Sequence, residues 1–170
     1  MKKIVVVLIL DIVLWAVFGP DANAQVPKEA STSFTMVYSS TFKVLPMGQE
    51  RLQMTYEVMG VAIGDTPEDF HHNTSFRCLG ALHAVKGEYK DDGGFCVFIR
   101  PDGDQIFSTY KAAGKAGAGG GAKGAFTIVG GTGKLVGIQG DGEFPRFAVR
   151  PAAEGTFQGY ARWKGQYKLP

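Results

Sequence analysis

The stretch FQGYARWKGQY at residues 157–167 alternates between two kinds of side chain. Its odd-numbered positions hold aromatic residues, alanine or glycine, and its even-numbered positions hold glutamine, tyrosine, arginine and lysine. Because successive side chains of a β-strand point to opposite faces of a sheet, this stretch predicts a strand with one buried face. The same period of two recurs at residues 52–58 and 70–78, which predicts two more strands.

The rest of the chain from residue 34 onward predicts an all-β fold. Further strand pieces are predicted at residues 94–99, 105–111, 125–129, 135–138 and 142–149. No long window repeats with the helical period, and only residues 66–69, with Pro67 at the first position, would form a single helical turn. Many short strand pieces joined by glycine-rich turns are typical of a sandwich or a closed antiparallel barrel.

Glycine favours the barrel over the sandwich. The chain holds 24 glycines in 170 residues, about twice the usual share of roughly 7%. Some of them, such as Gly159 and Gly165, fall inside the apolar phase of a predicted strand. Strands that bend sharply to close a small barrel need positions without a Cβ. The length suits one domain, which we expect at residues 34–170.

The N-terminus predicts export. Two lysines, an apolar run at residues 4–18 and an Ala-Asn-Ala cleavage site at residues 22–24 are typical of a secretory signal peptide, here residues 1–24. The alternative, a membrane anchor, would need about 20 apolar residues, and this run is shorter and contains Asp11. Residues 25–33 are polar with a proline and predict a flexible leader. We therefore expect a periplasmic or secreted protein with no membrane insertion after cleavage.

The expected location outside the cytoplasm indicates how the two cysteines should be interpreted. Cys78 and Cys96 are the only cysteines, and an oxidising compartment favours a disulfide between them. Their separation of 18 residues suits two strands joined by a hairpin whose turn lies at residues 90–94. The alternative is a pair of buried free thiols that pack as small hydrophobic side chains.

Several functions are disfavoured. A net charge of +2 argues against a nucleic-acid binder, which usually has a strongly basic face. The segment GGTGKL at residues 130–135 lacks the first glycine and the final serine or threonine of a phosphate loop. No nucleophile elbow of the form G-x-S-x-G occurs. No metal site is predicted, because neighbouring strand residues point to opposite faces and the chain has only three histidines, His71, His72 and His83. We expect no cofactor.

Polar residues on the strands are the candidates for a site inside a barrel. A carboxylate in an apolar lumen can act as an acid or base, because burial raises the pKa of a carboxyl group. Glu57 shares its strand phase with Met59 and Val61, so we predict it as a catalytic residue together with Tyr110. The alternative is that such residues merely face water on the exposed side of a strand. The predicted ligand-binding residues are Tyr56, His71, Asn73, Arg77 and Tyr160.

One stretch resembles a known superfamily. The segment GGTGKLVGIQG at residues 130–140, with Gly103 and Asp104 upstream, resembles the GTGKxxGIxGxG stretch of allene oxide cyclase-like and dirigent-like barrels. Residues 34–170 resemble small exported bacterial members of that superfamily, and both cysteines and the Arg162-Trp-Lys-Gly run are part of the same pattern. The resemblance implies a closed, calycin-like, eight-stranded antiparallel β-barrel with an apolar lumen, often assembled as homo-dimers or homo-trimers.

The resemblance leaves three functions open. Allene oxide cyclases direct an unsaturated fatty-acid epoxide to a cyclopentenone, and dirigent proteins steer the coupling of phenoxy radicals. Both act mainly by orienting a reactive hydrophobic molecule. Our first hypothesis is an exported barrel that binds a small hydrophobic molecule without an obligatory cofactor. The second is an isomerase or cyclase with acid–base groups in the lumen. The third is a non-catalytic assembly barrel with a filled core, and a cavity below about 300 Å³ would favour it.

Overall fold

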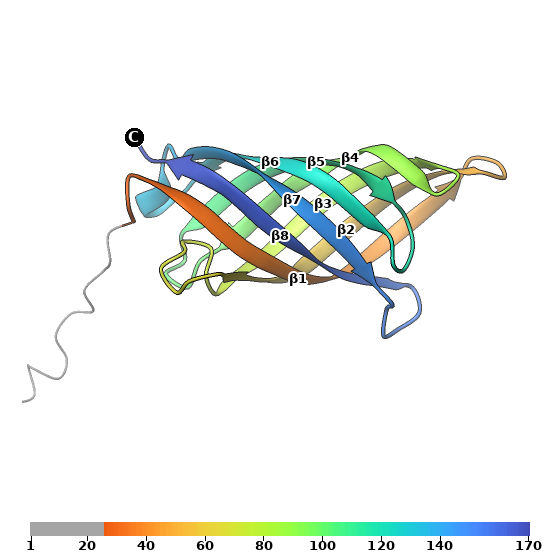
Figure 1. The fold of residues 1–170 in the computed structure, drawn as a ribbon, viewed down its shortest axis with the longest axis horizontal. Helices are drawn as coiled ribbons and strands as arrows, with labels where there is room; N and C mark the ends of the chain where they lie inside the picture. The colour runs from red at the N-terminus through yellow and green to blue at the C-terminus, as the bar shows by residue number, and fades with distance from the viewer. Residues whose placement is uncertain (1–25) are drawn as a thin grey trace, which may run out of the picture.

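The computed structural model describes residues 26–170 and confirms the predicted barrel. Eight strands follow one another as antiparallel neighbours, and the first pairs with the last, so the sheet closes on itself (Figure 1). The predicted signal peptide at residues 1–24 lies outside the described residues. Among residues 26–170, no helix has the length and apolar character needed to cross a membrane.

The elements follow chain order around the barrel, with one short 3-10 helix between the sixth and seventh strands. They are β1 (Glu29–Pro46), β2 (Arg51–Gly64), β3 (Thr74–Val85), β4 (Glu88–Ile99), β5 (Gln105–Lys115), β6 (Gly121–Gly131), η1 (Gly133–Leu135), β7 (Gln139–Val149) and β8 (Thr156–Lys168). In β8 the predicted alternation is confirmed, because Ala161, Trp163 and Tyr167 are buried whereas Arg162 and Lys164 are exposed.

Two predicted boundaries are wrong. The expected leader at residues 25–33 is too long, because β1 begins at Glu29 and Ser33 already pairs with Lys164 of β8. The backbone of residues 29–33 is needed to close the barrel. The strand expected at residues 135–138 is instead the end of η1 and its exit, since Leu135 and Ile138, three residues apart, are both fully buried. One tight turn buries two side chains at that spacing, which an extended strand does not.

Aromatic rings and loop residues close one end of the barrel, the end at which the described chain begins and finishes (Figure 1). Phe34 stacks on His71 with ring centroids 3.9 Å apart, and Phe126 stacks on Trp163 at 4.3 Å. Leu135 from η1 is fully buried. The half of the barrel toward this end is therefore a packed core.

The hairpin of β3 and β4 contains an irregularity that turns a charged side chain inward. Its turn is Lys86-Gly87, both with positive φ (55° and 77°), as a two-residue hairpin turn requires, and not the expected residues 90–94. β4 carries one extra residue relative to both neighbours, because its pairing register shifts between Tyr89 and Gly93 against β3 and between Tyr89 and Asp92 against β5. This β-bulge leaves Lys90 exposed and buries both Tyr89 and Asp92.

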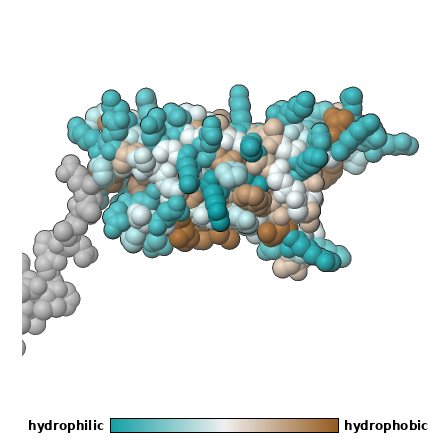
Figure 2. Space-filling view, viewed as in Figure 1, coloured by the Kyte–Doolittle hydropathy of each residue, from teal (hydrophilic) through white to brown (hydrophobic). Residues whose placement is uncertain are grey.

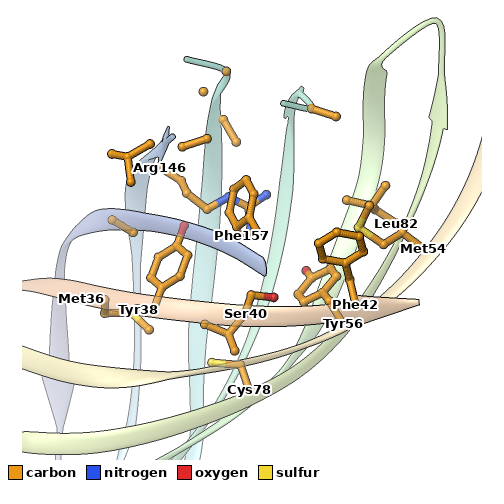
Figure 3. A pocket seen from close by; sticks show the side chains of 18 of the residues that line it. Met36, Tyr38, Ser40, Phe42, Met54, Tyr56, Cys78, Leu82, Arg146 and Phe157 are labelled. Atoms are coloured by element: carbon orange, nitrogen blue, oxygen red, sulfur yellow. The ribbon is translucent and has the colours of Figure 1, made fainter. Parts of the chain in front are cut away.

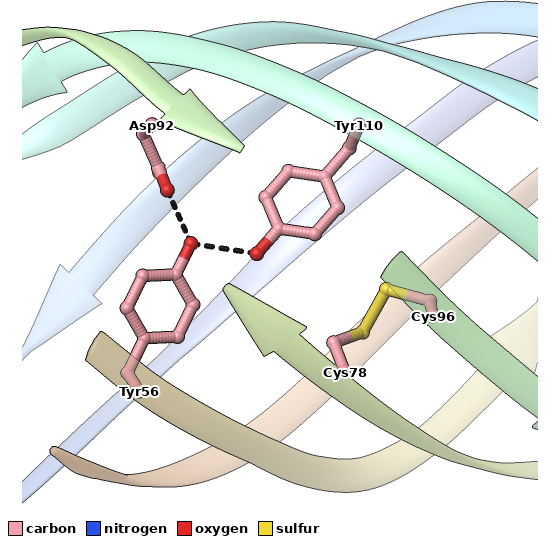
Figure 4. Close-up of a disulfide and its surroundings, with 5 residues drawn as sticks. All are labelled: Tyr56, Cys78, Asp92, Cys96 and Tyr110. Carbon is pink, nitrogen blue, oxygen red and sulfur yellow. Dashed lines mark hydrogen bonds between the residues drawn. A yellow bond between two sulfur atoms is a disulfide. The ribbon is translucent and has the colours of Figure 1, made fainter. Parts of the chain in front are cut away.

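The predicted cysteine pair is confirmed. Cys78 of β3 lies directly opposite Cys96 of β4, and their sulfur atoms are 2.00 Å apart, which is disulfide distance. Both side chains are buried on the inner face of the barrel, close to the bulge (Figure 4).

Candidate ligand site in the lumen

A cavity of about 320 Å³ occupies the other half of the barrel. Its walls are mostly apolar, with Met54, Leu82 and Phe157 among the lining side chains (Figure 3). Trp163 and Phe144, stacked 4.8 Å apart, also line the cavity and adjoin the packed core. Residues of the β5–β6 turn and the β7–β8 loop line it as well, so the cavity reaches the end of the barrel opposite the packed core. The filled core of the third hypothesis therefore accounts for only part of the lumen.

One cluster of polar side chains lies within these apolar walls. Asp92 is fully buried, and it accepts a hydrogen bond from the Tyr56 hydroxyl (Figure 4). It accepts another from Arg146 Nη2. The same Nη2 donates to the Tyr89 hydroxyl at 2.8 Å. The Tyr56 and Tyr110 hydroxyl oxygens are 2.6 Å apart. Because a carboxylate can only accept, the Tyr56 hydroxyl donates its hydrogen bond to Asp92. The hydrogen bond between the two tyrosines is therefore donated by Tyr110 and accepted by Tyr56.

Burial keeps Tyr56 and Tyr110 of this cluster, and Tyr38 of the cavity lining, protonated. It raises the pKa of Tyr110 to about 12, and it raises the pKa values of Tyr56 and Tyr38 further. Burial alone would lower the pKa of Arg146, but the adjacent Asp92 carboxylate holds it well above its usual value. At neutral pH the cluster is therefore a set of hydrogen-bond donors around an ion pair of zero net charge.

Two local features of the sequence build the cluster. The bulge in β4 turns Asp92 into the lumen. Gly80 of β3 leaves the space for the tyrosine pair, because a Cβ at this position would lie 2.3 Å from the Tyr110 hydroxyl and 2.6 Å from the Tyr56 hydroxyl. Both distances are far inside van der Waals contact, so no other residue fits here without a shift of the rings.

Two of the predicted site residues are brought together in the lumen, but Glu57 lies outside it, contrary to the prediction of a lumen carboxylate at this position. Tyr56 and Tyr110 line the cavity and contact each other. Glu57 lies on the outer wall, where Arg77 Nε donates a hydrogen bond to it at 2.5 Å. Strand alternation explains this, since Tyr56 points inward and its neighbour must point outward. The apolar residues that alternate in phase with Glu57 lie on the outer surface of the barrel. Met59, for example, is 56% exposed.

Arg77, Tyr160, Asn73 and His71, which we predicted as ligand-binding residues of the lumen, do not line the cavity. Arg77 is on the outer wall, and Tyr160 stacks there on the partly exposed Phe147, with centroids 4.9 Å apart. Asn73 is exposed in the turn before β3, with a left-handed φ of 57°. His71 is buried, but in the packed end of the barrel and away from the cavity lining.

His71 has a structural environment of its own. It lies between the rings of Phe34 and Phe70, and its Nδ1 is 3.1 Å from the Thr32 hydroxyl. Burial lowers the pKa of His71 despite the nearby Asp69. Burial would raise the pKa of Asp69, but hydrogen bonds from His71 and Ser33 hold it below its usual value. These contacts fasten the β2–β3 loop over the closed end.

Sequence reasoning misses Asp92, Arg146, Tyr89 and Tyr38. It places Asp92 in a turn, because two aspartates followed by two glycines are typical turn residues. Arg146 carries a usable signal, since it shares its strand phase with Phe144, a buried residue, and with Ala148. A charged residue inside an apolar phase indicates a lumen-facing charge, and it needs a partner.

The fold and the site define a class of protein: a closed eight-stranded antiparallel β-barrel with a packed end, an apolar cavity in the other half and a buried Asp–Arg pair in the cavity wall. No protein-family model matches the chain, and no curated protein or solved structure matches it either. The resemblance to allene oxide cyclase-like and dirigent-like barrels therefore stays a prediction. Among residues 26–170, no three His, Cys, Asp or Glu side chains are grouped so that they could hold a metal ion.

Proposed function

We propose that this barrel is an exported protein that binds one small hydrophobic molecule in its lumen, without an obligatory cofactor. The observation that carries the proposal is the cavity of about 320 Å³ with apolar and aromatic walls. Ligand sites usually begin at about 300 Å³ and combine such walls with a few polar groups. The cysteine pair at disulfide distance supports the exported location, because disulfides persist in oxidising compartments.

The test is native mass spectrometry of the protein purified from its own host, followed by titration with naphthalene. We expect a co-purified small molecule or naphthalene binding, read from the fluorescence of Trp163, which lines the cavity. The variant Ala148→Phe places a ring in the cavity lining and should abolish binding. Ala113→Phe, at an exposed position of β5, is the matched control and should bind normally. A protein that carries no ligand and does not bind naphthalene would refute the proposal.

The polar cluster favours a second candidate, an isomerase or cyclase. With Glu57 on the outer wall, Asp92 is the lumen carboxylate, and it is linked through Tyr56 to Tyr110. The raised pKa of Tyr110 keeps its hydroxyl protonated, so Tyr110 would act as a general acid once its hydrogen bond to Tyr56 is exchanged for one to the substrate. Prolonged incubation of the co-purified molecule with the protein should then yield an isomer of equal mass in chromatography. Tyr110→Phe should slow its formation at least tenfold, and an unchanged molecule would rule out this candidate.

We also propose that copies of the chain associate through an apolar part of the outer wall. Val37 pairs with Val61 across β1 and β2, and Leu79 pairs with Phe95 across β3 and β4. All four are about half exposed or more, and Figure 2 shows apolar surface along one edge of the barrel. Patches of this kind on a soluble protein mark interaction surfaces. Light scattering should report a dimer or trimer that Phe95→Lys converts to monomer, and a monomeric wild-type protein would refute the association.

A further inference from the structure

Some hydrogen-bond donors on the lumen wall have no acceptor among residues 26–170. Tyr56 and Tyr110 use their protons within the cluster, as the direction of donation from Tyr110 through Tyr56 to Asp92 requires. Arg146 makes both of its hydrogen bonds through Nη2. A guanidinium carries five N–H donors, so its Nε and Nη1 groups remain for a ligand in the cavity that Arg146 lines.

Two further lining residues carry buried donors without a partner among residues 26–170. The Tyr38 hydroxyl and the indole Nε1 of Trp163 are both buried and make no hydrogen bond. An indole nitrogen can only donate. Figure 3 shows the Tyr38 hydroxyl on the side of the cavity where Arg146 lies. The Tyr38 hydroxyl can donate or accept, whereas the indole and Arg146 can only donate, so a ligand acceptor is the group that could pair with all three.

The charge of the lumen selects a neutral ligand. Asp92 compensates Arg146 within the cavity wall. The other charged lining residue, Lys115, is exposed beside the β5–β6 turn and pairs with Glu88 at 3.4 Å. A carboxylate ligand would bring a second negative charge next to the Asp92–Arg146 pair, and its desolvation would not be offset by a free cation. A hydroxyl could also accept from Arg146, but its own proton would then need a further acceptor, whereas a carbonyl oxygen only accepts.

We infer that the lumen ligand is a small neutral carbonyl compound whose oxygen accepts a hydrogen bond from Arg146. The inference rests on the proposed function and adds the chemical class of the ligand. At roughly 30 Å³ per liquid-packed group, the cavity of about 320 Å³ holds on the order of ten heavy atoms. That size corresponds to a single-ring or terpenoid-sized ketone, aldehyde, ester or lactone.

Three probes of nearly equal size test the inference: benzylacetone, a neutral ketone; butylbenzene, its hydrocarbon analogue; and hydrocinnamate, its carboxylate analogue. Dissociation constants come from calorimetry, and the carbonyl stretch of bound benzylacetone comes from infrared difference spectra. We expect benzylacetone to bind about tenfold more tightly than butylbenzene, as one hydrogen bond to a charged donor predicts. Hydrocinnamate should bind more weakly than both, and the carbonyl stretch should move to lower frequency on binding.

The variant Asp92→Asn/Arg146→Met removes both charges of the pair together. It should bind butylbenzene as the wild type does, lose the preference for the ketone and lose the infrared shift. Arg162→Met, which removes an exposed arginine of the outer wall, is the matched control. It should retain the preference for the ketone and the infrared shift. Equal affinity for ketone and hydrocarbon, a ketone preference that survives in the double variant, or tightest binding of hydrocinnamate would overturn the inference and leave the proposed function standing. Binding of none of the three probes would refute the proposed function itself.

Discussion

The buried pair of Asp92 and Arg146 should dominate the response of this barrel to mutation. Asp92 is fully buried and the Arg146 side chain is 17% exposed. Replacing Arg146 by methionine removes the positive charge and leaves the carboxylate buried without its ionic partner. Breaking a buried ion pair from one side costs about 3–5 kcal/mol, because the remaining charge has lost both water and partner. A domain of this size is stable by only about 5–15 kcal/mol, so Arg146→Met should lose a large fraction of that.

A double variant separates the destabilisation caused by an unpaired carboxylate from the net contribution of the ion pair to stability. Asp92→Asn/Arg146→Met has no buried charge, and the amide oxygen introduced by Asp92→Asn would still accept the Tyr56 hydrogen bond. Replacing a whole buried pair is often neutral, so we expect the double variant to unfold within about 1 kcal/mol of the wild type. Arg162→Met, which removes an exposed arginine of β8, should change stability by no more than about 0.5 kcal/mol.

The assay is urea unfolding followed by Trp163 fluorescence and circular dichroism, with linear extrapolation of the free energy of unfolding to water. The reasoning requires equal m-values, so that a shift of the midpoint reports stability alone. If Arg146→Met loses less than about 1 kcal/mol, the pair is solvated and our account of the cluster is refuted. If the double variant is as unstable as the single one, the loss comes from packing of the arginine stem rather than from the orphaned carboxylate.

Three further predictions concern other parts of the barrel. Replacing both Cys78 and Cys96 by alanine should lower the free energy of unfolding by about 3 kcal/mol, since the pair closes a loop of 18 residues; urea midpoints equal to those of the oxidised wild type would contradict this. Gly80→Ala should cost about 1–3 kcal/mol in the same assay through the clash with the Tyr110 hydroxyl, and Tyr110→Phe should recover part of that loss. The lowered pKa of His71 means that the unfolded chain binds more protons below about pH 6.5, so stability should fall as the pH drops from there toward the lower folded pKa. His71→Phe should flatten that slope in melting temperatures measured from pH 7.5 to 5, and an unchanged slope would assign the effect to other groups.

The fold was predictable because its signals are periodic and local. The alternation in β8 specifies one buried face, and the crowded glycines indicate strands that bend. The pairing of Cys78 with Cys96 follows from two strands at the right separation. The ends of elements were harder to predict, because β1 extends to Glu29 only through its pairing with β8, a contact that spans almost the whole described chain.

The site was harder to predict because a small barrel with an apolar patch on its outer wall has two apolar faces. Along β2 both phases carry hydrophobic residues, Met54 toward the lumen and Met59 toward the outside, so composition does not tell which phase holds the site. The sequence prediction places Glu57 in the lumen for that reason. The correct phase is set by Tyr56, whose hydroxyl needs a buried partner, and that partner comes from another strand.

A single extra residue in β4 brings the polar cluster together in the lumen. Without the bulge, strand alternation would place Tyr89 and Asp92 on opposite faces, since they are three residues apart. With it, both face inward, and Arg146 can donate to both from one nitrogen. The Nε and Nη1 groups of Arg146 then make no hydrogen bond within the cluster. The positive charge of Arg146 is already balanced by Asp92. The proposed preference for a neutral acceptor rests on this one extra residue in β4. Hydrophobic periodicity does not report such a residue, because it shows only as a break in the pattern.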